Sequence, residues 1–349
     1  MEPKRMKWMV GFGVLVVALL GLFFLNIGLG SIRIPFSEIV TVLGGGEASK
    51  KAWTTIILNT RLPQTITALL AGAGLAIGGL QMQTLFRNPL AGPSILGISS
   101  GAGLGVAMII LFAGNFLGIS ISSLGLIGHL TVVGAAFIGA MLILLLIVLF
   151  ARTLKDNTIL LIVGIMVGYA ASSIIGVMKF YSPKEDVHAY VIWGLGSFAN
   201  VSWELLGVMM PIIGLGIIGG LLLVKPLNVL ILGESYAENL GVNIQRTRLL
   251  ILCCTGLLTA VITAFCGPIA FLGLAVPHLT KGLFRTTDQK ILMPAVILAG
   301  SVLALFCNLI ARMPGFDGAL PINVVTGMIG APIVISVIIK RRRLSSINA

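Results

Sequence analysis

The stretch LLAGAGLAIGGLQMQTLFRNPLAGPSILGISSGAG spans residues 69–103 and holds the pattern that decides the fold. An apolar run ends at Phe86, a polar turn Arg87-Asn88-Pro89 follows, and a second glycine-rich apolar run begins after it. An Asn-Pro pair is typical of a turn that ends a helix. Glycines recur at four-residue spacing, in the sets Gly74 and Gly78, and Gly97, Gly101 and Gly105. Such spacing predicts grooves of small residues where membrane helices approach each other closely.

The whole chain is similarly apolar and rich in glycine. Hydrophobic residues make up 57% of the 349 residues and charged residues only 10%, and Gly occurs 44 times. A soluble protein of this length needs a more polar surface, so the sequence predicts an all-α integral membrane protein forming one transmembrane domain, 1–349. Ten spans are expected near 8–27, 62–86, 94–113, 122–150, 158–179, 203–224, 247–266, 271–284, 291–311 and 321–339. Of these, 271–284 is expected to be short, because Pro268 and Pro277 bracket it and Lys281 and Arg285 crowd its end.

The distribution of Lys and Arg residues predicts how the chain is oriented in the membrane. The formal net charge is +12, and 16 of the 23 Lys and Arg residues fall on the flank that the N-terminus shares, against 7 on the other. This bias predicts that both termini lie in the cytoplasm, with Lys340–Arg343 on the same side. The positive charge therefore indicates membrane topology and not binding of nucleic acid.

A weak internal repeat suggests how the spans are related. FRNPLA (86–91) ends one apolar run, and FCGPIA (265–270) ends another 179 residues later. On the expected topology the two runs cross the membrane in opposite directions, which favours two inverted repeats, a common plan in transporters. Chance similarity between apolar segments is the alternative.

Several energy sources and chemistries are absent from the sequence. All 11 Asp and Glu residues fall in expected loops, tails or span ends, so no buried acid is available to bind a coupling ion. No phosphate-binding G-x-x-x-x-G-K-[ST] loop, H-E-x-x-H or G-x-S-x-G motif occurs, and the four cysteines lack metal-ligand spacing. We therefore expect no enzyme activity, metal or cofactor on this chain. A transporter without its own energy source needs a separate ATPase. The alternatives are an ion-coupled secondary transporter or channel, and an intramembrane enzyme or structural subunit.

A polar insert interrupts the apolar sequence. LGESYAENLGVN (232–243) lies in the longest expected cytoplasmic loop, 225–248. Its residues fall on two helical faces, one with Glu234, Ala237 and Glu238 and the other with Tyr236 and Leu240, and Gly241 is placed to end the helix. About seven residues of helix are too few to be stable alone, so the insert must pack on its own protein or on a soluble partner.

A family resemblance favours the partner. The segment 69–103, preceded by Arg61-Leu62-Pro63, is similar to the permease subunits of bacterial ABC importers for iron–siderophore, heme and cobalamin, the FecCD/BtuC family. Further matches are WGLGSF (193–198), LGESYAENLGV (232–242), GPIAFLGLAVPHLTK (267–281) and LPINVVTGMIGAP (320–332). Together the matches cover the chain from about residue 55 to its end, in the family's order and spacing.

The resemblance implies an assembly. The chain would be a ten-span subunit of a homodimer in the lipid of the bacterial cytoplasmic membrane, with the pathway at the dimer axis. Two copies of a cytoplasmic ABC ATPase, which carry the ATP and Mg²⁺, would bind below it. A soluble or lipid-anchored binding protein would deliver a metal chelate from outside. The residues leave the cargo open among ferric siderophores, heme and cobalamin.

The resemblance also implies functional residues. Those expected to couple to the ATPase are Glu234, Ala237, Glu238, Leu240 and Gly241. Those expected to close the cytoplasmic end of the pathway are Asn88, Pro89, Leu90, Asn157 and Thr158, where Asn88 also suits a simple helix-ending turn. Arg61 and Arg312 match the arginines that grip the binding protein; anchoring at the membrane interface is the alternative. The chain departs from the family at Gln64, Ala319 and Asn323, which makes the expected outer surface less basic.

Overall fold

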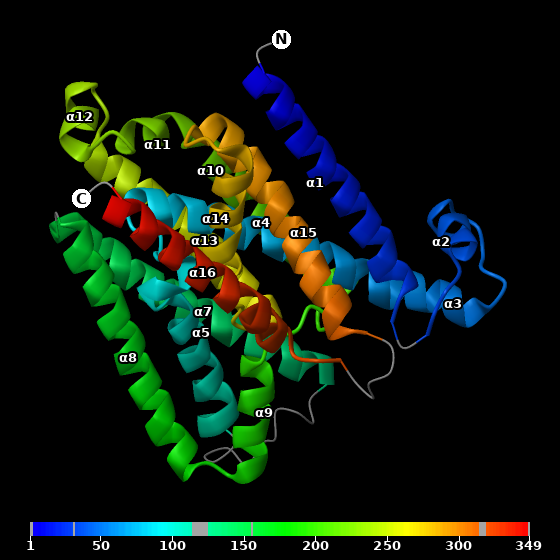
Figure 1. The fold of residues 1–349 in the computed structure, drawn as a ribbon. Coiled ribbons are helices and arrows are strands. Elements are labelled where there is room, and N and C mark those ends of the chain that lie inside the picture. The colour runs from blue at the N-terminus through cyan, green and yellow to red at the C-terminus, as the bar shows by residue number, and fades with distance from the viewer. Residues whose placement is uncertain (1–2, 31, 114–124, 155, 314–318, 348–349) are drawn as a thin grey trace. The chain divides into compact units, whose positions relative to one another are not determined.

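The described part of the chain is helical. The computed structural model describes residues 3–30, 32–113, 125–154, 156–313 and 319–347, and these contain helices and no strand (Figure 1). Among them, seven helices are long and apolar enough to cross a membrane, and Ile98–Phe112 and Ile322–Ser336 are shorter apolar helices. The expected polytopic, all-α membrane fold is confirmed.

Within this fold the chain forms two compact units. Unit 1 consists of Met1–Leu80, Phe198–Val208 and Ala270–Ala349, and unit 2 consists of Gln81–Ser197 and Met209–Ile269. Two helices, α4 (Leu62–Leu85) and α10 (Trp203–Leu222), have residues in both units.

Unit 1 is built around α15. Its elements are α1 (Pro3–Gly28), α2 (Phe36–Leu43), α3 (Lys51–Thr55), the π-helical segment η1 (Ile56–Arg61), α14 (Leu272–Phe284), α15 (Gln289–Ala311) and α16 (Ile322–Ile347). Helices α1, α14 and α16 all pack against α15. Helix α4 approaches α15 where Gly72 faces Gly300, since a Cβ atom on Gly72 would lie 2.2 Å from the Gly300 carbonyl oxygen. The small side chains Ala304 and Ala76 flank this contact.

Unit 2 is built around α7. Its elements are the 3-10 turn η2 (Pro93–Leu96), α5 (Ile98–Ala107), the π-helical η3 (Met108–Ala113), α7 (Gly125–Thr153), α8 (Asn157–Tyr181), α9 (Lys184–Gly194), α11 (Val224–Leu230), α12 (Glu234–Asn239) and α13 (Ile244–Cys266). Helices α5 and α13 pack against α7.

The predicted glycine groove on α5 is present. A Cβ atom on Gly101 would lie 2.6 Å from the Gly139 carbonyl oxygen, and one on Gly105 would lie 2.0 Å from the Ala135 carbonyl oxygen. Helices α5 and α7 therefore meet backbone to backbone. Gly97 begins α5 with a φ of +77°, a left-handed conformation that favours glycine.

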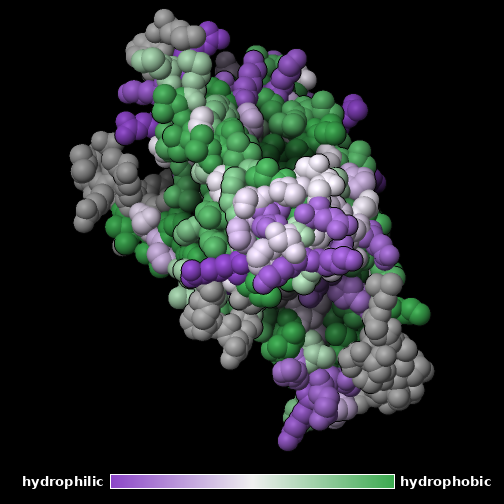
Figure 2. Space-filling model, turned by 90° about the vertical axis from the view of Figure 1, so that its right-hand side faces the viewer, coloured by the Kyte–Doolittle hydropathy of each residue, from purple (hydrophilic) through white to green (hydrophobic). Residues whose placement is uncertain are grey.

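Each expected span overlaps a helix. The segment 271–284 forms α14, which is short as expected, with 13 residues, and which continues through Pro277. The span expected from residue 62 instead continues a helical run that starts at Lys51 and reaches Leu85 over 35 residues. Apolar side chains remain exposed along α1, α7 and α8. Figure 2 shows hydrophobic residues above and below a hydrophilic patch on the face that it draws. An exposed apolar surface of this kind suits contact with lipid.

Candidate functional site

The polar insert forms a short, well-capped helix. Helix α12 ends in two hydrogen bonds, from Val242 N to Ala237 O at 3.0 Å and from Gly241 N to Glu238 O at 2.9 Å. With Gly241 at a φ of +80°, this is a Schellman motif, so the expected role of Gly241 in ending the helix is confirmed. The sequence folds this way locally because glycine alone adopts that conformation without strain.

Helix α12 is held from inside by Glu234. The Asn157 side-chain amide, at the first turn of α8, donates to Glu234 Oε1 and also to the Leu85 carbonyl oxygen at 3.2 Å. Arg248 of α13 lies 3.8 Å from the same carboxylate oxygen and donates to Leu154 O at 2.9 Å. Glu234 thus joins the end of α4, the start of α8 and the start of α13.

The expected cytoplasmic gate residues fall into two groups. Asn157 and Thr158 lie at this junction, whereas Asn88, Pro89 and Leu90 form a turn that follows α4. Asn88 Oδ1 accepts a hydrogen bond from Leu90 N at 2.9 Å, and Ala91 N donates to Asn88 O at 3.0 Å, which closes the predicted Asn-Pro turn. Arg87 precedes the turn in a left-handed conformation, and its guanidinium donates to Leu230 O at 3.3 Å. Thr158 N donates to the Asp156 carboxylate, which caps α8.

The expected coupling residues divide into anchored and exposed ones. Ala237 is fully buried within the chain, and Glu234 is half-buried in the junction just described. Glu238, Leu240 and Gly241 are exposed. The exposed side also presents Tyr236 at 53% and Leu232 at 64% exposure, which the coupling prediction did not include. Helix α12 therefore has an inward face, with Glu234 and Ala237, and an outward face, on which Tyr236, Glu238 and Leu240 are exposed.

A cleft lies beside the inward face. It has a volume of about 250 Å³ and is lined by Ala151, Arg152, Leu154, Glu234, Glu238, Ile244, Gln245 and Arg248. Gln245 contributes a further link, from its side-chain amide to Arg152 O at 3.1 Å. The sequence did not predict that Arg248 or Arg87 belongs to this site, because each has the sequence context of an ordinary basic residue at the end of a span.

Arg61 is buried, whereas a residue that docks a partner protein is expected to be exposed. It is 2% exposed and donates to the carbonyl oxygens of Ile27 at 2.7 Å, Gly28 at 3.0 Å and Ile32 at 2.5 Å. These bonds tie the start of α4 to the end of α1. The docking role of Arg61 stays a prediction, and the guanidinium serves the fold in any case.

Arg312 lies next to Arg61 and is partly exposed. Its guanidinium donates to Asn26 O at 3.4 Å. A Cβ atom on Gly30 would lie 3.0 Å from Arg61 Nη2 and 3.1 Å from Arg312 Nη2, so the two guanidiniums converge on this glycine. Burial lowers the pKa of Arg312 to about 10, and the neighbouring Arg61 charge acts in the same direction.

Two of the three family departures have structural roles. Gln64 Nε2 donates to Asn308 Oδ1 at 3.1 Å, and Asn308 Nδ2 donates to Asn26 Oδ1 at 2.8 Å, all three side chains being buried. Asn323 Oδ1 accepts a hydrogen bond from Ala270 N at 3.0 Å, in the loop before α14. Ala319 is exposed.

No metal centre is evident in the described residues. They contain no group of three or more His, Cys, Asp and Glu side chains that could hold an ion. The four cysteines are free, and Cys266 and Cys307 are buried. Asp317 lies outside the described residues.

Comparison with known proteins places the chain. The profile of the FecCD transport family matches residues 17–340. The chain belongs to the FecCD transport family. It is 36% identical over 284 residues to the vitamin B12 import system permease protein BtuC of Salmonella paratyphi A and of Salmonella typhi, which covers 81% of this chain and 83% of each relative.

A solved structure shares the fold of this FecCD family member. The structure is an inward-facing conformation of a metal-chelate type ABC transporter, with a TM-score of 0.81 and 29% sequence identity. The superposition covers 95% of this chain and 99% of the other. The chain is therefore a multi-pass membrane permease of the ABC importer type, with the BtuC-like fold, and it is not catalytic by itself.

Proposed function

We propose that this chain forms, as a homodimer, the transmembrane pathway of an importer for a metal chelate in the bacterial cytoplasmic membrane. A binding protein delivers the chelate from outside, and two copies of a separate ABC ATPase drive its transfer into the cytoplasm. Family membership supports this proposal, as do the relatives, a vitamin B12 import permease and a metal-chelate type ABC transporter. Both termini lie in the cytoplasm, on the side that carries most of the Lys and Arg residues.

The observation that carries the proposal is the division of α12 into two faces. Its inward face is bonded to α8 and α13 through Glu234, whereas its outward face presents Tyr236, Glu238 and Leu240 to water. A six-residue helix does not hold this geometry alone, and exposed apolar side chains outside the membrane suit a protein partner. We assign the outward face, within the loop 225–248, to the ATPase.

The same junction connects the ATPase to the pathway. A push on the outward face of α12 reaches Asn157 through Glu234, and Asn157 is bonded to the last residue of α4, Leu85. The turn Asn88-Pro89-Leu90 directly follows α4. We therefore propose that this turn, with Asn157 and Thr158, closes the cytoplasmic end of the pathway, and that displacement of α12 opens it.

The binding protein is proposed to contact the end of unit 1 that holds Arg312. There the two guanidiniums converge on Gly30, and no carboxylate among the described residues pairs with either one. A carboxylate from a partner would offset this repulsion between like charges. Arg61 contributes its charge at this position and its hydrogen bonds to the fold.

A paired substitution tests the ATPase assignment. Glu238→Arg combined with Leu240→Asp is expected to abolish copurification of the cognate ATPase, because both side chains face outward and neither holds the fold. Glu185→Arg, an exposed acid in the first turn of α9, is the matched control and retains the ATPase. Unchanged copurification of the double variant refutes the assignment, as does uphill transport by the purified chain on an ion gradient without ATPase.

The chelate is identified through the binding protein. Mass spectrometry of the ligand that copurifies with the cognate binding protein is expected to find a corrinoid, a heme or a ferric siderophore. A bare metal ion or an organic solute without metal would overturn the proposed substrate class.

A further inference from the structure

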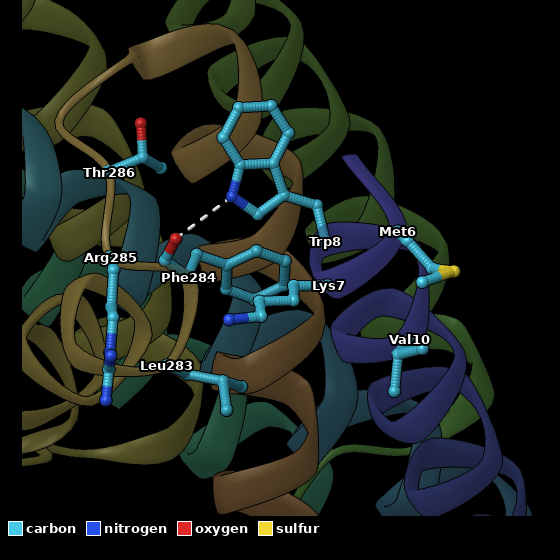
Figure 3. Close-up of a pocket in the computed structure, with 8 residues that line it drawn as sticks. All are labelled: Met6, Lys7, Trp8, Val10, Leu283, Phe284, Arg285 and Thr286. Carbon is cyan, nitrogen blue, oxygen red and sulfur yellow. Dashed lines mark hydrogen bonds between the residues drawn. The ribbon is translucent and has the colours of Figure 1, made fainter. Parts of the chain in front are cut away.

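A groove lies between the start of α1 and the end of α14, both in unit 1. Its volume is about 810 Å³, and it is lined by Met6, Lys7, Trp8, Val10, Leu283, Phe284, Arg285 and Thr286 (Figure 3). A volume of this size is in the range of small-molecule sites. Lys7 and Arg285 extend into it from the two helices, with the Leu283 side chain between them in this view (Figure 3).

The base of the groove is well packed. The Trp8 indole nitrogen donates to Phe284 O at 3.0 Å, and the Phe12 and Phe284 rings lie 4.9 Å apart. Phe284 is buried in a cluster with Leu15 and Ala295, which joins α1, α14 and α15. The groove is therefore a formed feature of unit 1, and the last carbonyl of α14 already has its hydrogen-bond donor.

The upper part of the groove is amphipathic and carries positive charge only. Met6, Val10 and Leu283 are each more than half exposed, and Lys7 and Arg285 are exposed beside them. The lining includes no carboxylate. Asp288, the next acid along the chain, accepts a hydrogen bond from Lys290 N at the start of α15.

Arg285 holds an unfavourable backbone conformation. It ends α14 with a φ of +48°, in the left-handed region where glycine is usual. An arginine there costs about 1 kcal/mol relative to glycine. Glycine at this position would leave Lys7 as the single cation among the lining residues. A role of the Arg285 side chain in the groove explains why arginine stands where the backbone conformation favours glycine.

The groove also lies at a membrane boundary. The first candidate span begins at Arg5, so Met6–Val10 occupy its first turns, where tryptophan and basic side chains meet lipid headgroups. These residues precede the region matched by the family profile, 17–340. The α14 side of the groove, 283–286, lies within the matched region.

We propose that this groove binds a membrane phospholipid with an anionic headgroup. Lys7 and Arg285 pair with the headgroup phosphate, and the acyl chains lie along Met6, Val10 and Leu283. An exposed apolar strip that ends at two cations, with no carboxylate among the lining residues, matches a lipid with its charge at one end. Basic pockets between helices at the membrane surface recognise such headgroups. The inference does not depend on the importer function.

The test compares lipids on the purified full-length chain in detergent. Phosphatidylglycerol is expected to raise the unfolding temperature and to remain bound in native mass spectrometry, whereas phosphatidylcholine does neither. Lys7→Gln combined with Arg285→Gln is expected to weaken phosphatidylglycerol binding roughly 30-fold, since each basic residue near an anionic surface contributes about fivefold. Lys184→Gln with Arg246→Gln, an exposed pair elsewhere, leaves binding unchanged.

Three outcomes overturn the proposal. One is equal retention of phosphatidylglycerol by the Lys7→Gln/Arg285→Gln variant and the control. Another is equal stabilisation by phosphatidylcholine. The third is equal stabilisation by inorganic phosphate, which would mean that the groove binds an anion without the lipid. A Val10→Asn/Leu283→Asn variant, which keeps both cations, is expected to lose lipid retention and so separates acyl from headgroup contacts.

Discussion

The Asn157 side-chain amide donates a hydrogen bond to the Glu234 carboxylate, although 77 positions separate the two residues. This bond connects the first turn of α8 to the first turn of α12. Asn157, which was expected at the gate, and Glu234, which was expected at the ATPase surface, are therefore direct hydrogen-bond partners. Helix α12 is therefore bonded to α8 and is part of the fold of unit 2.

The bond predicts unequal effects of two neighbouring acids. Glu234→Ala removes the acceptor of Asn157 and leaves the buried Arg248 without its carboxylate, so the free energy of unfolding is expected to fall by about 1–3 kcal/mol. Glu238→Ala, one helical turn later and exposed, is expected to change it by less than about 0.5 kcal/mol. Denaturation of both purified variants in one detergent measures the difference. Equal stabilities would show that the junction does not hold α12.

The glycine contact between α5 and α7 predicts a second unequal pair. A Cβ atom on Gly139 would lie 2.2 Å from the Gly101 carbonyl oxygen, whereas one on Gly134, on the same helix, meets nothing within 4 Å. Gly139→Ala is expected to destabilise the protein by about 1–3 kcal/mol through overpacking. Gly134→Ala is expected to be neutral or slightly stabilising, because alanine favours helix. Thermal unfolding of the two variants decides; a harmless Gly139→Ala contradicts the backbone contact.

Arg61 offers a test between fold and docking. Arg61→Ala orphans the carbonyls at the end of α1 and is expected to lower stability by roughly 3 kcal/mol. Arg33→Ala, an exposed arginine near the same end of α1, is expected to have almost no effect. If Arg61→Ala were as stable as Arg33→Ala but lost affinity for the binding protein, docking would be its main role.

The loop after α2 is expected to respond to acid. Hydrogen bonds from the Ser49 hydroxyl and from Ser49 N, the latter at 2.9 Å, lower the pKa of Glu38 below its usual value. Because the folded pKa is depressed, this contribution is present above about pH 4.5 and is lost as the pH falls through the folded pKa. Hydrogen exchange at Ser49, corrected for its intrinsic pH dependence, is expected to lose protection in that window. Glu38→Gln should abolish the pH response; a response that persists in this variant rules out Glu38 as its source.

The sequence predicted those features that depend on local pattern. Apolar run length located each span, and four-residue glycine spacing located the α5 groove at Gly101 and Gly105. On α4, close backbone approaches are made by Gly72 against Gly300 and by Gly79 against Gly273. The predicted contacts of Gly74 and Gly78 on the same helix stay a prediction.

Features that depend on contacts between segments far apart in the chain could not be predicted from the sequence. Arg61 appeared to lie at an exposed span end, yet helix continues upstream to Lys51, and the end of α1 supplies carbonyls that bury the guanidinium. The buried set Asn26, Gln64 and Asn308 has no local signature, because its members lie on three helices. Likewise, no pattern relates Asn157 to Glu234.

The glycine seam between α5 and α7 limits how unit 2 can change shape. Side-chain interfaces can switch between two packings by exchanging rotamers, but a seam made of backbone has no rotamers to exchange. Any transport cycle must therefore carry α5 and α7 together as one rigid piece. Helix α13 meets α7 differently, because Leu144 of α7 packs a side chain directly against Gly256.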